Sequence, residues 1–227
     1  MNDATQDTSA NQTTGQGAFS VKDCALIAIA TGKQDYTLSE LRNDLQDVSL
    51  DSIYYHFWGG LLQARFEERE FNNDFAGWSR HHLHDNRLAE RLAVIDPTDY
   101  ADLEELRRDM LDVIEEHLDS EAAVSWQRAT RPFEFVRSQI VVFDTHRRLQ
   151  QPAELAEVMP RLSPSSIFYH FIDAHRRLAG NDDFRLWLSA FDSQYDNLCQ
   201  DLAGVDPYFG SLSELRDQLT NIFKKYF

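Results

Sequence analysis

A six-residue motif occurs twice in this chain, and this repetition constrains the fold more than any other feature. Residues 52–57 read Ser-Ile-Tyr-Tyr-His-Phe, and residues 166–171 read Ser-Ile-Phe-Tyr-His-Phe. The residues that follow each motif also recur in the same order. They are Asp74, Trp78, Asp96-Pro97 and Leu106-Arg107 after the first motif, and Asp183, Trp187, Asp206-Pro207 and Leu215-Arg216 after the second. This order predicts an internal duplication in which each copy has its own hydrophobic core.

The spacing of apolar residues predicts an all-α fold. Apolar residues between Val21 and Ile29 fit a first helix, which Gly32 is expected to end. Thr37 and Glu40 have the spacing of a capping box at the start of a second helix. Further helical patterns follow in both halves, and no segment is assigned as a strand. We therefore expect two tandem homologous helical repeats of about six helices each, related by a pseudo-twofold axis.

The predicted domain boundaries follow from this plan. Residues 1–18 contain no large apolar side chain after Met1, so they are expected to form a disordered tail. Residues 19–130 are the first predicted repeat and residues 131–227 the second. The boundary is placed at Arg131-Pro132, because proline interrupts regular structure.

The charge balance excludes one large class of partners. The chain has 22 Lys and Arg against 38 Asp and Glu, which gives a formal net charge of -16. Nucleic-acid binding depends largely on cationic groups that neutralise phosphates, so neither DNA nor RNA is expected as a partner. No apolar run is long enough to cross a bilayer and no signal peptide is visible, so we expect a cytoplasmic protein without a membrane partner.

The repeated polar and aromatic residues are the candidate site. They are Ser52, Tyr55, His56, Asp74 and Trp78 in the first copy, and Ser166, Tyr169, His170, Asp183 and Trp187 in the second. In one interpretation each histidine is a general base in a pocket and the aspartate orients it. In the other, a buried imidazole bonds the carboxylate and locks two helices together. The structural interpretation is favoured, because packing residues should persist in both copies whereas a catalytic site needs only one.

A histidine-rich stretch offers a possible metal site. On a helix His81 would share a face with both His84 and Asp85, and imidazole and carboxylate groups bind divalent ions. The alternative is an exposed helix end, where cationic histidine is favoured by the helix dipole. The second copy has Ala-Phe-Asp-Ser-Gln in this place, so the cluster is not part of the repeated plan.

A group of basic residues stands out against the acidic remainder of the chain. These residues either connect the two repeats or form an anion-binding or partner-binding patch at the junction, and the first interpretation is favoured. They are Arg128, Arg131, Arg137, Arg147 and Arg148.

The motif order of the first half resembles a bacterial and archaeal helical domain of unknown function. The resemblance rests on Ser-Ile-Tyr-Tyr-His-Phe, on Asn73-Asp74-Phe75 with Trp78, and on the Leu-Ala-Glu-Arg-Leu-Ala run of residues 88–93. The second copy departs from it, with Asp182 in place of the asparagine. Similar segments occur beside enzymes of sugar and compatible-solute metabolism such as glycosyltransferases, so the resemblance implies an accessory role and supplies no catalytic residues.

We therefore expect a non-catalytic, cytoplasmic module without a cofactor that binds another protein as an accessory or regulatory subunit. The resemblance implies a carbohydrate-metabolising enzyme as the partner, and a homo-oligomer is left open. The first alternative is a hydrolase that uses a divalent metal held by His81, His84 and Asp85, with His56 as a further ligand. The second alternative is a small-ligand sensor with pockets near His56 and His170.

Overall fold

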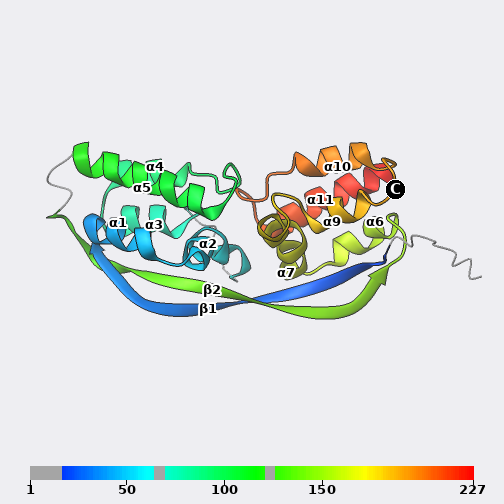
Figure 1. Ribbon diagram of the computed structural model, residues 1–227, viewed down its shortest axis with the longest axis horizontal. Coiled ribbons are helices and arrows are strands. Elements are labelled where there is room, and N and C mark those ends of the chain that lie inside the picture. Colours follow the sequence, from blue (N-terminus) through cyan, green and yellow to red (C-terminus); the bar gives the residue numbers. More distant parts are fainter. Residues whose placement is uncertain (1–16, 64–69, 121–125) are drawn as a thin grey trace, which may run out of the picture.

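The computed structural model describes residues 17–63, 70–120 and 126–227, and a long two-stranded antiparallel ribbon runs through its whole length (Figure 1). Strand β1 spans Phe19–Thr37 and strand β2 spans Arg128–Leu149. The predicted all-α fold of two six-helix repeats is therefore wrong. Residues 1–16 of the predicted disordered tail lie outside the described residues.

Two helical lobes lie on the same side of this ribbon (Figure 1). Lobe 1 follows β1 and contains α1 (Leu38–Asp47), α2 (Leu50–Trp58), η1 (Gly59–Leu62), α3 (Asp74–His81), α4 (Asn86–Ala93) and α5 (Leu103–Ser120). Lobe 2 follows β2 and contains α6 (Glu154–Val158), η3 (Met159–Arg161), α7 (Pro164–Ile167), η4 (Phe168–Asp173), α8 (Ala174–Arg177), α9 (Asp183–Leu188), α10 (Asp196–Ala203) and α11 (Leu212–Tyr226).

Several helices begin where the sequence supplies a capping side chain. Thr37 accepts a hydrogen bond from the amide of Glu40, whose carboxylate bonds back, so the predicted capping box of α1 is present. Ser211 forms the same arrangement at the start of α11. Asn73 and Asp182 cap α3 and α9 through their side-chain oxygens. These caps fix the residues at which the helices begin.

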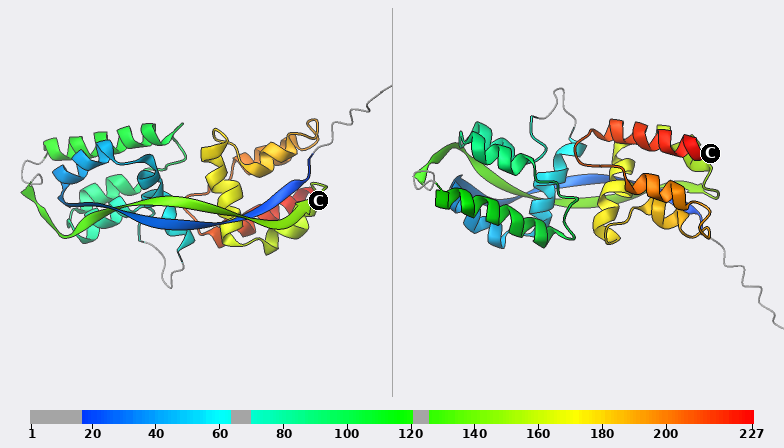
Figure 2. Two further views of the ribbon diagram at one scale, coloured as in Figure 1. Left: turned by 60° about the horizontal axis from the view of Figure 1, so that its bottom comes forward. Right: turned by 90° about the horizontal axis from the view of Figure 1, so that it is seen from above.

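The ribbon connects the two lobes by exchanging strands between them. Phe19 of β1 pairs with Leu149 beside lobe 2, whereas Thr37 pairs with Arg128 beside lobe 1. Each strand therefore starts against one lobe and leads into the helices of the other, as the views in Figure 2 also show. The predicted repeat boundary between residues 130 and 131 falls inside β2.

Irregular pairing explains why β1 was predicted as a helix. Buried Phe19 and Val21 are two apart, as strand residues are, but the next buried residue is Cys24, three positions later. The pairing register shifts between Val21 and Lys22, so the face that packs on the helices changes phase there. A spacing of three between buried residues is also typical of a helix. The alternation of buried and exposed residues that indicates a strand was therefore not apparent in the sequence.

One continuous core of apolar side chains joins the lobes and the ribbon. Between the lobes, Tyr208 packs on Phe57 and Trp58 with ring centroids 6.2 and 4.9 Å apart. The Tyr54 hydroxyl also crosses the junction and donates to Asp173 at 3.3 Å. The helices of both lobes therefore pack on one ribbon, which the two lobes share.

Candidate functional site

Side chains of the first motif copy hydrogen-bond both backbone groups of one residue of β2. The Ser52 hydroxyl donates to the Val136 carbonyl at 2.8 Å, and the Val136 amide donates to Nε2 of His56 at 3.1 Å. Ser52 and His56 are one turn apart on α2, so both reach the same peptide position. Both backbone groups of Val136 are thus satisfied by side chains.

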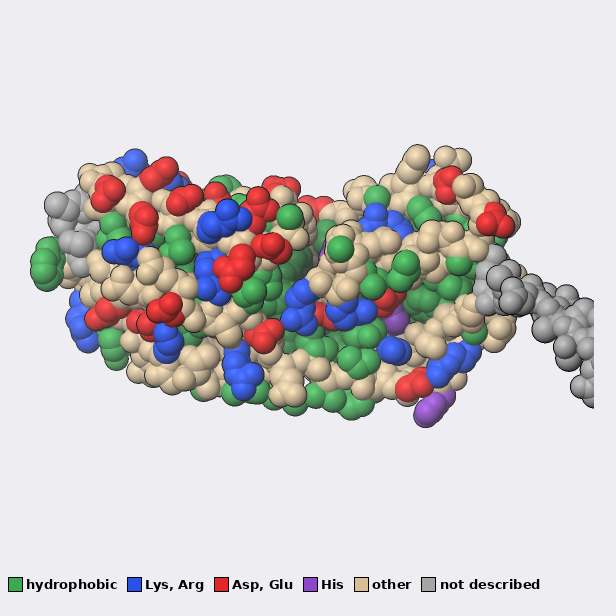
Figure 3. Space-filling model, viewed as in Figure 1, with side chains coloured by type: hydrophobic (Ala, Val, Ile, Leu, Met, Phe, Trp, Pro, Cys, Tyr) green, Lys and Arg blue, Asp and Glu red, His purple; other side chains and the backbone are tan. Residues whose placement is uncertain are grey.

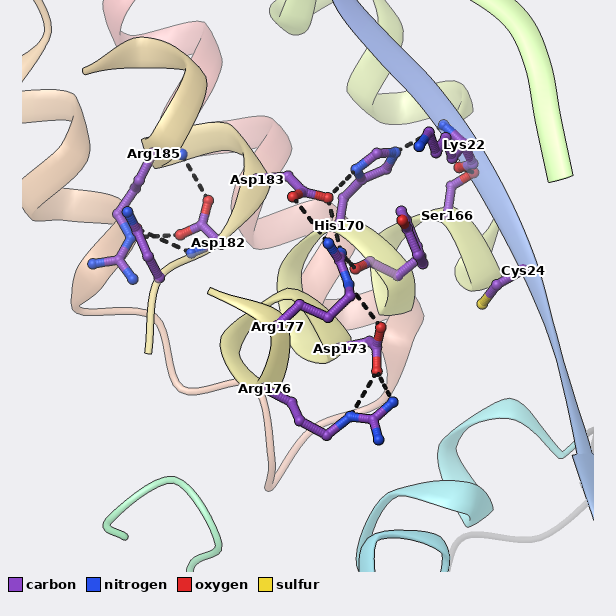
Figure 4. Close-up of polar contacts among 12 residues, drawn as sticks. Lys22, Cys24, Ser166, His170, Asp173, Arg176, Arg177, Asp182, Asp183 and Arg185 are labelled. Carbon is purple, nitrogen blue, oxygen red and sulfur yellow. Dashed lines mark hydrogen bonds and ion pairs between the residues drawn. The ribbon is translucent and has the colours of Figure 1, made fainter. Parts of the chain in front are cut away.

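Side chains of the second motif copy hydrogen-bond one residue of β1 in the same way (Figure 4). The Ser166 hydroxyl donates to the Lys22 carbonyl at 2.7 Å, and the Lys22 amide donates to Nε2 of His170 at 2.8 Å. Lys22 and Val136 are separated by the same number of positions as the two motifs. We call each of these arrangements a clamp, and each clamp holds the strand that leads into the opposite lobe.

An aspartate fixes the tautomer of each clamp histidine. Nδ1 of His56 lies 3.0 Å from Asp74, and Nδ1 of His170 lies 2.7 Å from Asp183. Because Nε2 accepts a backbone proton, Nδ1 must carry the ring proton that is donated to the carboxylate. The imidazole–carboxylate contact considered from the sequence is present, and both ring nitrogens are already bonded.

A charged network reinforces the second clamp. Arg177 bonds Asp183 at 3.1 Å and also bonds the buried carboxylate of Asp173 at 2.9 Å (Figure 4). Burial raises the pKa of Asp183, but hydrogen bonds from His170 and Arg177 outweigh it, so the pKa lies below its ordinary value. Asp183 therefore stays ionised and keeps accepting the imidazole proton at neutral pH.

Each repeated tryptophan donates a hydrogen bond to the backbone near the start of one strand. The Trp78 indole donates to the carbonyl of Arg131 at 2.9 Å, and the Trp187 indole donates to the carbonyl of Gly17 at 2.9 Å. Each acceptor lies just before the phenylalanine that enters the core, Phe133 or Phe19. Tyr55 and Tyr169 pack edge-on against the clamp histidines at 5.3 and 5.0 Å.

The clamp residues do not form the relay of a nucleophilic enzyme, although serine, histidine and aspartate are all present. In such a relay, the histidine accepts the serine proton through the nitrogen that faces the hydroxyl. Here that nitrogen of His56 accepts the amide of Val136, and Ser52 donates to a carbonyl. His56 and His170 are 3% and 2% exposed, so neither ring is open to a substrate in this conformation.

The predicted metal residues are not brought together. His81 lies 3.0 Å from Glu70 on the surface, and His84 has a left-handed backbone with φ of 58° and an exposed side chain. Asp85 caps α4 and bonds the buried His117 at 2.6 Å. Within the described ranges, no three His, Cys, Asp or Glu side chains are grouped so that they could hold a metal ion.

Sequence reasoning missed the cluster of Asp173, Arg176 and Arg177 at the lobe junction. Both arginines bond Asp173, at 3.1 and 2.9 Å, and Arg176 also reaches Asp51 of lobe 1 at 3.2 Å. An aspartate followed three and four positions later by arginines shares a helix face with them, so charge spacing could have indicated this cluster.

The outer face of the ribbon carries an exposed apolar strip. We call this the outer ribbon face and define it by Ala25, Ile27 and Phe143, which are exposed, and by Ile29 and Val141, which are half-buried. Ile27 is 47% exposed and Phe143 is 51% exposed, although alternate residues such as Leu26 pack on the core. All five of the basic residues singled out in the sequence lie on β2 and are exposed, with two carboxylates on the same strand. The ribbon is therefore both apolar and basic in an acidic protein.

Comparisons with known proteins place the chain in a family and support the fold. A family model described as "Family of unknown function (DUF5752)" matches residues 16–224. The solved structure titled "The structure of OrfY from Thermoproteus tenax" is similar, with a TM-score of 0.79 and 23% identity, over 93% of this chain and 96% of that one. No curated protein matches the chain. None of the helices in the described residues is both long and apolar enough to cross a membrane.

Proposed function

This chain belongs to the DUF5752 family, and we propose that it is a non-catalytic accessory or regulatory subunit that binds another protein through the outer ribbon face. The observation that carries this proposal is the exposed apolar strip on β1 and β2, which no helix of the described chain covers. Exposed apolar patches with polar borders are typical of protein-binding sites.

The clamp chemistry supports a role without catalysis. The repeated Ser and His side chains bond the strand backbone, which positions the ribbon. Removing a backbone bond to free a catalytic base would leave a buried amide unsatisfied, at a cost of about 1 to 3 kcal/mol. The repeated Ser and His side chains, which resemble catalytic groups, therefore have a structural role.

The charge of the ribbon supports a specific kind of partner. The apolar strip runs beside the exposed side chain of Arg137, with Arg147 and Arg148 further along β2, whereas the helical surfaces are rich in carboxylates. Figure 3 shows apolar side chains along the lower edge of the molecule, where the ribbon runs, with acidic groups gathered above. The partner surface should be an apolar strip bordered by acidic side chains, because complementary charges set orientation and association rate.

The resemblance of the sequence motifs also indicates what kind of protein the partner is. It implies that the partner is an enzyme of carbohydrate or compatible-solute metabolism. We also infer that the two halves are copies of one strand-plus-helices unit, since matching residues make matching bonds to Val136 and Lys22. A duplicated unit with exchanged strands gives one continuous ribbon, which is longer than either copy could present alone.

The test is a comparison of variants in a purified complex. Tagged protein is captured from its native cytosol, and the partner is identified by mass spectrometry and then purified for size-exclusion binding assays. Ile27→Ser with Phe143→Ser should weaken the complex about tenfold or more, because central apolar contacts contribute most to interfaces. Val94→Ser is the control, since Val94 is 76% exposed but lies away from the ribbon.

Each outcome of this comparison is informative. Loss of the complex in the ribbon variant and retention in the control supports the proposal, provided that both variants melt at the wild-type temperature. Retention of full affinity by the ribbon variant would refute the outer ribbon face as the docking surface. One equivalent of bound metal with no partner would favour the hydrolase alternative.

A further inference from the structure

A partly open cavity of about 780 Å³ lies between the two lobes, and the clamps and the outer ribbon face do not use it. Its volume lies within the usual range for small-molecule sites. The floor is apolar and includes Leu50, Trp58 and Ile172 from both lobes. Neither His56 nor His170 lines it, so it differs from the pockets expected from the sequence.

The repeated Asp-Pro pairs meet at this cavity. Asp96 lines it from lobe 1 and Asp206 lines it from lobe 2. Oδ1 of Asp96 accepts hydrogen bonds from Thr98, and Oδ1 of Asp206 accepts one from the amide of Tyr208. Among the described residues, the second oxygen of each carboxylate has no hydrogen-bond donor. Each carboxylate therefore keeps an oxygen that can accept a further hydrogen bond.

Two further carboxylates share this arrangement. Oδ1 of Asp102 accepts the amides of Glu104 and Glu105, and Oδ1 of Asp51 accepts Arg176. In the described part of the chain, their Oδ2 atoms also have no hydrogen-bond donor. Both residues line the cavity.

The arginines of the cavity wall do not cancel this negative charge. Arg176 bonds the buried carboxylate of Asp173, and Arg185 bonds the buried carboxylate of Asp182 (Figure 4). Each of these two arginines is therefore already engaged in an ion pair with a carboxylate of its own lobe. An anionic ligand would meet uncompensated carboxylates in a partly enclosed space, where like charges repel strongly.

His175 lines the cavity beside this apolar floor. Nε2 of His175 is buried and has no partner among the described residues. Burial is the main cause that lowers the pKa of His175, so the ring is neutral at pH 7. A neutral imidazole leaves the charge of the wall to the carboxylates, and the apolar floor suits the hydrocarbon body of a ligand.

We propose that the cavity between the lobes binds a small organic cation, an alkyl amine whose ammonium groups bond the free carboxylate oxygens of Asp96 and Asp206. The methylene groups lie on the apolar floor. Because the two carboxylates belong to different lobes, a diamine connects the lobes directly. This site is separate from the proposed docking surface on the ribbon.

The test uses three linear probes of equal length, titrated calorimetrically into the full chain at low salt. They are 1,4-diaminobutane, 1,4-butanediol and succinate, which have the same four-carbon chain and carry cationic, neutral and anionic ends. Asp96→Asn with Asp206→Asn removes both charges, and the Asn side-chain oxygens can still accept the turn bonds. Asp112→Asn on α5 is the matched control, because it removes an exposed carboxylate far from the cavity lining.

We expect saturable binding of one equivalent of the diamine and none of the diol or succinate. The double variant should weaken binding about tenfold or more, whereas the control should retain the wild-type affinity. Equal weakening by Asp112→Asn would show diffuse attraction to an acidic surface and would overturn the proposal. Binding of succinate, or no saturable diamine binding by the folded wild type, would overturn it as well.

Discussion

Each clamp histidine holds two partners, so its removal breaks two hydrogen bonds. His56→Ala deprives the Val136 amide of its acceptor and Asp74 of its donor. We expect the free energy of unfolding to fall by about 1 to 3 kcal/mol in chemical denaturation, since an unsatisfied buried group costs that much. His170→Ala should behave alike through Lys22 and Asp183.

The control for these variants is His81→Ala, because His81 is exposed and its ion pair with Glu70 is on the surface. Its effect should stay within about 0.5 kcal/mol. If His56→Ala left stability unchanged but abolished ligand or partner binding, the clamp interpretation would be wrong.

Asp35 on β1 gives the protein a specific dependence on pH. Its side chain is 4% exposed, and burial, then the charges of Asp44 and Glu40, raise its pKa from 3.8 to about 7. A raised pKa favours the protonated form in the folded state. The stability that Asp35 contributes is therefore fully present below its unfolded pKa and is lost as the pH rises through about 7.

Asp35→Asn tests this dependence, because asparagine does not ionise. Thermal unfolding should show that wild type loses stability between the unfolded and folded pKa values and that the variant loses less. At pH 8 the variant should be the more stable protein. Asp112→Asn, an exposed change on α5, should follow the wild-type curve. Parallel curves for Asp35→Asn and wild type would contradict the assigned pKa.

At the scale of elements, the ribbon depends on two matching irregularities next to the clamps. Thr31 donates its hydroxyl to the Phe135 carbonyl at 2.7 Å, and Thr145 donates to the Val21 carbonyl at 2.5 Å. The next residue on each strand has a left-handed backbone. Gly32 has φ of 83° and His146 has φ of 61°. Glycine adopts this conformation readily, whereas histidine is strained in it.

Substitutions at these two positions should have different effects on the free energy of unfolding. We expect Gly32→Ala to lower the free energy of unfolding by about 1 kcal/mol, since alanine is unfavourable at positive φ. His146→Gly should leave stability unchanged or raise it by up to about 1 kcal/mol. Denaturant titrations measure both, and a destabilised His146→Gly would indicate that the contact of His146 with Asp144 at 3.9 Å outweighs the backbone strain.

The same irregularities limited what the sequence could predict. Capping boxes at Thr37 and Ser211 were local patterns, so the starts of α1 and α11 were predictable. The strands were not, because the register shift after Val21 produces a helical spacing and because Gly32 fitted a helix stop. The pairing of β1 with β2 joins distant segments, and no local pattern in one sequence specifies it.

At the scale of the whole molecule, the repeat identified the residues of the clamps but not what they hold. Ser52, His56, Asp74 and Trp78 and their counterparts recur because each set meets one strand. Their acceptors and donors are backbone groups, which every residue has, so the sequence could not single out Lys22 or Val136. The outer ribbon face was hidden because its residues belonged to a predicted helix.

In the proposed function, the helical lobes support a ribbon whose outer face binds the partner. Hydrogen–deuterium exchange of the full chain, alone and in the purified complex, tests this most directly. We predict that the partner slows exchange in the ribbon segments around Ile27 and Val141 and leaves the exposed surfaces of α4 and α5 unchanged. Slower exchange confined to the helical lobes, with the ribbon amides unaffected, would contradict it.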